Sequence, residues 1–119
     1  TQAPIIVSGP QAEFEPIVPR LIEMHGTLEG IDKAARTHED LRRRAINKRL
    51  RALAEKSGAI YVDKFALLCG NGACPVLIPG SGKLFIWDYG HWSVEGARYF
   101  GAQLKADPAL GQTIFVGEI

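Results

Sequence analysis

The chain has 119 residues, of which 46% are hydrophobic and 23% are charged, and its formal net charge is +1. These values are typical of one globular domain or a large piece of one. No apolar run approaches the roughly 18 residues that cross a bilayer. The N-terminal residues lack the basic start and long apolar stretch of a secretion signal. Composition therefore favours a globular domain and excludes a membrane-spanning helix.

The N-terminal quarter predicts one strand followed by a long surface excursion. Pro4 to Ser8 is a short apolar, β-rich run that stops at Gly9-Pro10, so it predicts a buried strand ending in a turn. Glycine and proline interrupt residues 11–36 repeatedly, and we expect a loop there with one helical turn at Pro19–Met24.

The clearest helix is predicted from Thr37 to Ser57. Thr37 and Asp40 resemble a capping box, and Gly58 is a natural C-terminal stop. Ala59–Asp63 then predicts a second buried strand, and a helix followed promptly by a strand indicates an α/β layer. The apolar stripe of this helix is expected to face the core, with the arginines outside it: Leu41, Ala45, Ile46, Leu50, Leu53 and Ala54.

Basic residues are concentrated in the same segment. Arg36 to Lys56 holds eight basic and three acidic residues, a net charge of +5, and the remainder has a net charge of −4. The segment is either a basic surface for nucleic acid or another anionic partner, or simply a solvated helix face. The near-neutral whole chain favours the solvated face.

The C-terminal half predicts two short β runs and a second helix. Pro75–Ile78 and Lys83–Trp87 are apolar runs around a glycine-rich turn, which indicates a hairpin or an irregular β loop. Ser93 is a suitable N-cap for a helix over Val94–Ala106, whose apolar side would be formed by Val94, Ala97, Phe100, Gly101 and Leu104. Thr113–Val116 is expected to form a last short strand.

Asp88 and His91 are the candidate catalytic residues. They lie three positions apart in a turn that precedes a helix, so the carboxylate can accept the Nδ1–H of the imidazole. Nε2 is then free to take a proton from a hydroxyl. Taken alone, the spacing also fits an aspartate that caps a turn beside a structural histidine.

The wider sequence resembles the SGNH hydrolase superfamily. An apolar run, Asp88-x-x-His91, Ser93, Gly96 and an amphipathic helix are similar to its last signature block. The opening PIIVSGPQAEF and the loop Cys69–Cys74 resemble the SGNH domain of membrane-bound O-acyltransferases of the OafA type, in the acyltransferase 3 family.

This resemblance implies a flavodoxin-like three-layer α/β/α fold that transfers or hydrolyses acyl groups, often acetyl, on glycan hydroxyls. Asp88 and His91 take the acid and base places of the triad. Spacing alone allows Cys69 and Cys74 to be free thiols or a disulfide; the family's paired-cysteine loop implies the disulfide, and with it a periplasmic or other extracytoplasmic location.

The nucleophile of that family is missing from the sequence. There is no GDS serine and no GxND block. We therefore expect residues 1–119 to be the C-terminal portion of one SGNH-like domain, inactive alone and partnered by the upstream half, by a glycan and by a membrane acyltransferase domain. The alternative nucleophiles lack the expected context: Ser8, Ser57, Ser81 and Ser93.

Other chemistries have weaker support. Cys69, Cys74, Asp88 and His91 have atom types that zinc accepts, but the cysteine spacing is looser than in zinc sites. We expect no metal and no cofactor, and no nucleic-acid partner.

The remaining histidines and the aromatic residues beside the dyad are expected to be mostly structural. His25 and His38 follow no ligand spacing and are expected at the surface. The aromatic residues Trp87, Tyr89 and Trp92 are expected to pack, although one of them could face a glycan. The rival hypothesis, from another class, is a non-catalytic domain that binds an anionic partner through the basic helix Arg42–Arg51.

Overall fold

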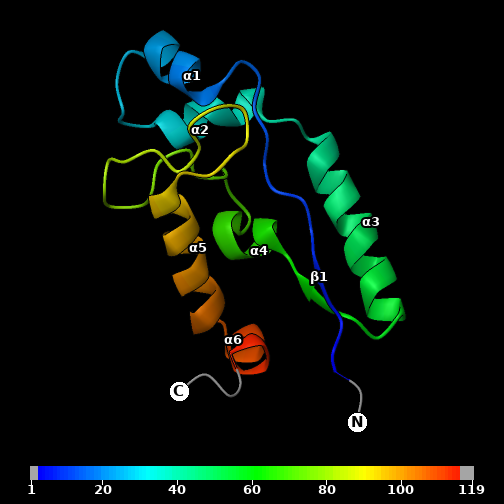
Figure 1. Ribbon diagram of the computed structural model, residues 1–119. Coiled ribbons are helices and arrows are strands. Elements are labelled where there is room, and N and C mark those ends of the chain that lie inside the picture. Colours follow the sequence, from blue (N-terminus) through cyan, green and yellow to red (C-terminus); the bar gives the residue numbers. More distant parts are fainter. Residues whose placement is uncertain (1–2, 116–119) are drawn as a thin grey trace.

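The computed structural model describes residues 3–115 (Figure 1). The fold is mixed α/β and about half helical. Its elements in chain order are β1 (Ile6–Ser8), α1 (Val18–His25), α2 (Ile31–Ala35), the 3-10 turn η1 (Arg36–His38), α3 (Arg42–Lys56), β2 (Ile60–Val62), α4 (Lys64–Cys69), α5 (Val94–Ala106) and α6 (Pro108–Ile114). None of the helices in this range is long and apolar enough to cross a bilayer.

The two strands form a small parallel sheet. Ile6 lies opposite Ile60 and Ser8 opposite Val62. Helix α3 lies on one side of the strand pair, and α4 continues from β2 on the other side (Figure 1). β2 is largely buried, but β1 is not: Ile6 is 44% exposed, and Ile5, which directly precedes the strand, is 70% exposed. Both predicted strands are confirmed, each over three residues, but the predicted burial is confirmed for β2 and wrong for β1.

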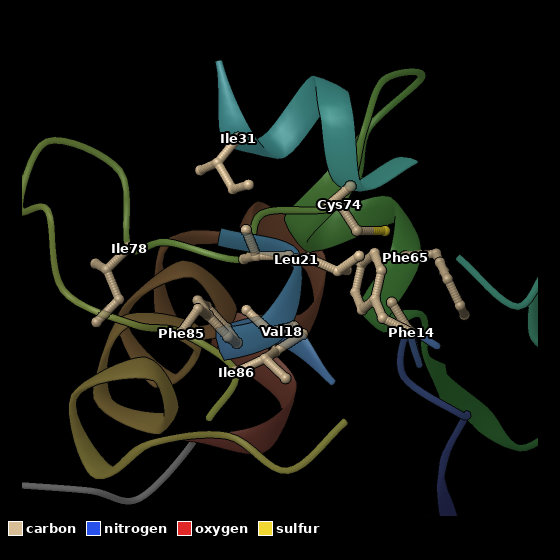
Figure 2. Packing of buried hydrophobic residues seen from close by; sticks show 12 residues of the cluster. Phe14, Val18, Leu21, Ile31, Phe65, Cys74, Ile78, Phe85 and Ile86 are labelled. Atoms are coloured by element: carbon tan, nitrogen blue, oxygen red, sulfur yellow. The ribbon is translucent and has the colours of Figure 1, made fainter. Parts of the chain in front are cut away.

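The main hydrophobic core lies beside the sheet rather than on it. It is built by α1, α2, α4 and the irregular segment 74–86. The labelled side chains of this cluster point toward a shared interior (Figure 2). Its largest fully buried side chains are Val18, Ile31, Val76 and Phe85. The chain is elongated, with a radius of gyration of 15.5 Å, compared with about 13.5 Å for a compact domain of this length.

The segment predicted as a long loop contains two short helices. The helical turn expected at Pro19–Met24 is confirmed as α1, but α2 was not predicted. Gly26 has φ 88° and ends α1, and Gly30 has φ 72° and precedes α2. Glycine favours this left-handed backbone, so these glycines are helix boundaries and not loop residues.

The long helix begins later than its sequence suggests. The prediction from Thr37 is wrong, because the Thr37 hydroxyl donates to Ala34 O and the chain forms η1 there. Helix α3 starts at Arg42, whose backbone N–H donates to the Asp40 carboxylate. Its end at Gly58 is confirmed, with φ 77°.

The buried residues of α3 are Asn47 and Ala54, so the predicted burial of the apolar stripe is confirmed for Ala54 but is wrong for most of the stripe. Asn47 is buried and bonds to the Tyr61 hydroxyl through Oδ1 (2.7 Å) and to Asp63 through Nδ2 (2.9 Å). Most of the stripe expected in the core is instead exposed: Leu41 (63%), Ile46 (41%), Leu50 (38%) and Leu53 (61%).

The C-terminal half differs from the predictions in three respects, the first being that α4 was not predicted. A hairpin-like bridge joins Leu77 to Leu84, and α5 spans the predicted Val94–Ala106. The predicted packing side of α5 is confirmed only in part: Phe100 packs against the core, but Val94 is 65% exposed and the buried residue of the helix is Gly96. The strand expected at Thr113–Val116 is wrong as far as Phe115, because α6 runs through Ile114; Val116 lies outside the described residues. The Asp107 cap and Pro108 at the first turn explain this helix.

Candidate active site

Asp88 and His91 form a hydrogen-bonded pair. The Asp88 Oδ2 atom lies 2.6 Å from His91 Nδ1. The other oxygen, Oδ1, accepts the backbone N–H of Gly90 at 2.9 Å and of His91 at 2.8 Å. The Asp88 side chain is 19% exposed and the imidazole is 58% exposed. The expected contact is confirmed, and it uses Nδ1, so Nε2 remains as the second nitrogen of a largely exposed ring.

These bonds also set the ionisation of the carboxyl group. Desolvation acts to raise the pKa of Asp88. The hydrogen bonds from the N–H groups of Gly90 and His91 and from the imidazole lower the pKa by more than desolvation raises it. The pKa of Asp88 falls from 3.8 to about 2. The group is therefore an anion at neutral pH, the form that orients an imidazole and stabilises it when it becomes protonated.

The turn that holds the pair is tied to the segment that leaves β1. Three hydrogen bonds join them: Gln11 Nε2 to Gly90 O (2.6 Å), Phe14 N to Tyr89 O (2.7 Å) and Val18 N to Asp88 O (2.9 Å). Gln11 follows the last residue of β1 closely, so the pair lies toward the carboxyl end of the strands. In parallel α/β sheets this is the end where ligands bind.

Gln11 and Gly90 are the residues of this site that sequence reasoning missed. A Cβ on Gly90 would meet Glu13 Cγ at 2.8 Å, so the turn passes close to the segment after β1. The position of Gln11 just after a predicted strand indicates a place in the site, because the loops that follow parallel strands converge on ligand sites.

Aromatic rings flank the imidazole. Trp87 stacks on His91 with ring centroids 5.8 Å apart and planes at 26°. Tyr89 meets the same ring edge-on at 5.1 Å and 69°. Trp87 and Tyr89 are 53% and 45% exposed. Trp92 instead packs against the core, with its centroid 5.3 Å from that of Phe85.

None of the four candidate serines hydrogen-bonds to the imidazole within residues 3–115. Ser93 Oγ donates to Leu84 O and accepts the Gly96 N–H, as expected of an N-cap. Ser81 Oγ donates to Ile78 O. Ser57 is at the C-terminal cap of α3, and Ser8 lies in β1.

The alternative metal site is not formed. Cys69 and Cys74 are joined in a disulfide, which removes both thiolate ligands. No group of three potential metal ligands occurs in the described part of the chain. His25 is exposed and bonds to Glu29 O, and His38 is partly buried in η1.

The basic helix has much of its charge neutralised locally. The Arg44 guanidinium pairs with the buried Glu39 carboxylate. Three further arginines pair with carboxylates of the fold: Arg42 with Asp40, Arg43 with Glu13, and Arg51 with Glu55 and Asp63. This pairing disfavours α3 as a surface for an anionic partner.

The comparisons with known proteins identify the family of the chain. No curated protein and no solved structure matches the chain. One family model, described as the SGNH domain fused to AT3 domains, matches residues 1–106, which include β1, the disulfide loop, the Asp88–His91 turn and all of α5. The chain belongs to this family of SGNH domains fused to AT3 acyltransferase domains.

Proposed function

We propose that Asp88 and His91 are the carboxylate and general base of a serine acyl-transfer site. The domain would transfer or hydrolyse O-acyl groups of glycans, above all O-acetyl groups. The observation that supports this most strongly is the 2.6 Å contact between Asp88 Oδ2 and His91 Nδ1 beside an exposed imidazole. The family supplies the acyltransferase and esterase context.

The proposed mechanism follows from the two ring nitrogens. Asp88 accepts the Nδ1–H and so keeps Nε2 unprotonated and able to accept a proton. Nε2 removes the proton from a serine hydroxyl, and the serine oxygen attacks the acyl carbonyl. The imidazolium returns the proton to the departing alcohol, leaving an acyl-serine. A sugar hydroxyl or a water then attacks this ester, and His91 again takes and returns the proton.

The proposed serine belongs to the upstream half of the domain. No GDS serine occurs in the sequence, and the candidate serines make other contacts or lie in other elements. The exposed Ile5 and Ile6 of the β1 edge and the exposed apolar stripe of α3 support a further layer of protein there. Residues 1–119 would then be the C-terminal portion of a flavodoxin-like α/β/α domain, next to a membrane acyltransferase domain.

The proposed location is periplasmic or otherwise extracytoplasmic. The disulfide between Cys69 and Cys74 supports it, since such bonds persist mainly in oxidising compartments. O-acylated polysaccharides outside the cytoplasm would be accessible to the domain there.

The proposal is tested by measuring acyl-ester hydrolysis. The protein used is a longer one that contains both residues 1–119 and the proposed upstream half. Asp88→Asn and His91→Ala should each lower kcat with p-nitrophenyl acetate by roughly a thousandfold, because one disturbs the tautomer and the other removes the base. His25→Ala, at an exposed histidine away from the pair, is the matched control and should leave kcat unchanged. Wild-type kcat in His91→Ala would refute the assignment.

A further inference from the structure

The exposed aromatic residues beside the imidazole do not contribute to the core. Trp87 and Tyr89 remain about half exposed while both contact the His91 ring. Trp92, which is next to His91 in sequence, packs inward instead. Two large rings that contact a candidate catalytic group and stay exposed are available to a ligand that contacts this group.

A groove begins at one of these rings. It has a volume of about 960 Å³ and extends from Tyr89 across the segment 13–17 to the start of α3. This volume is near the top of the range of about 300–1,000 Å³ for ligand sites, so an acyl group alone would not fill it. Its lining includes the apolar residues Phe14, Pro16 and Ile17 and the polar residues Arg20, His38 and Arg42.

The charges that line the groove are mostly paired within the protein. Arg42 bonds to Asp40, and Arg20 bonds to Glu23. The lining carboxylates Glu13 and Glu39 are held by Arg43 and Arg44. An anionic or cationic ligand would have to compete with these partners. Apolar surface combined with paired polar groups suits a molecule that has hydroxyls and apolar C–H faces but no net charge.

We propose that Trp87, Tyr89 and the groove beside Tyr89 form the acceptor subsite, which binds an uncharged oligosaccharide with sugar rings stacked on the two aromatic side chains. This subsite rests on the proposed function, because it names the substrate class of the same site. Trp87 and Tyr89 are specificity residues and take no part in proton transfer.

Binding to the 119-residue chain tests the subsite without any turnover. The probes are xylotetraose, which is neutral, and tetragalacturonate, which is anionic and of equal length. In NMR titrations, xylotetraose should shift resonances of Trp87, Tyr89 and the groove and should bind more tightly than tetragalacturonate. Equal or tighter binding of tetragalacturonate, shifts confined to another surface, or no shifts at 10-fold excess over about 1 mM protein would overturn the proposal.

Matched variants separate a stacking role from a structural one. Trp87→Ala and Tyr89→Ala should each weaken xylotetraose binding about threefold to tenfold, as expected for the loss of one aromatic contact. Tyr89→Phe keeps the ring and should bind like wild type, and Val94→Ala, at another exposed apolar residue, should also have no effect. Wild-type affinity in both Trp87→Ala and Tyr89→Ala would refute the stacking.

The dyad variant keeps this test distinct from that of the catalytic proposal. Asp88→Asn leaves both rings in place and should still bind xylotetraose while losing turnover in the longer protein. Retained turnover in Asp88→Asn together with lost binding in Trp87→Ala would refute the catalytic proposal alone. Lost turnover in Asp88→Asn together with unaltered binding in the aromatic variants would refute the subsite alone.

Discussion

At the scale of single residues, the Asp88–His91 pair is a local structure. The carboxylate is held by backbone N–H groups two and three residues ahead, so the spacing itself produces most of the geometry. This is why the contact could be predicted from the sequence. The Gln11 contact with Gly90 spans 79 positions, and no local pattern encodes it.

The pKa of Asp88 predicts how the stability of the fold changes in acid. Because the folded pKa of about 2 lies below the ordinary 3.8, the ionised carboxylate stabilises the native state above about pH 4. This contribution is lost as the pH falls through about 2. Carbon-detected NMR should find the carboxyl midpoint near pH 2, and the stability advantage over Asp88→Asn should shrink between pH 5 and 2. A midpoint near 4 would contradict the bonding described.

At the scale of secondary structure elements, the sequence predicts a helix boundary where a local cap marks it, but it does not predict which face of a helix is buried. The boundaries of α5 follow from the Ser93 cap, which is a local signal. The buried face of α3 depends on the contact of Asn47 with Tyr61 and Asp63, which follow it by 14 and 16 positions. An apolar stripe predicts that a helix face is buried against other protein, but it does not show whether residues 1–119 themselves supply the surface that buries it.

Replacing each of two glycines of α5 by alanine should change the unfolding free energy in opposite directions. A Cβ on Gly96 would lie 2.8 Å from Phe85 O, so Gly96→Ala should lower the unfolding free energy by about 1–3 kcal/mol. A Cβ on Gly101 meets nothing within 4 Å, so Gly101→Ala should raise it by about 0.5–1 kcal/mol through helix propensity. Urea unfolding of the two variants measures both. Equal effects would show that α5 does not pack closely on Phe85.

At the scale of the whole molecule, the elongated shape and the exposed α3 stripe support the proposed upstream half. Leu53 is 61% exposed, so Leu53→Glu should change the stability of this chain by less than about 0.5 kcal/mol. In the longer protein, Leu53→Glu should lower the unfolding free energy by about 2 kcal/mol or more, because it would place a carboxylate against buried apolar surface.

Leu28→Glu is the control for this comparison. Leu28 is 48% exposed between α1 and α2, away from the α3 stripe, and its replacement should be neutral in both proteins. Thermal or urea unfolding of both lengths gives the comparison. If Leu53→Glu is as neutral in the longer protein as in the chain alone, the stripe is not covered by the upstream half.

The location of the nucleophile is the most direct test of the central claim. The longer protein is treated with a fluorophosphonate, which phosphonylates activated serines, and the adduct is mapped by mass spectrometry. We expect one adduct on a serine outside residues 1–119, its loss in His91→Ala, and no adduct on this chain alone. An adduct on Ser8, Ser57, Ser81 or Ser93, or one that persists in His91→Ala, would show that the nucleophile is not an upstream serine activated by His91.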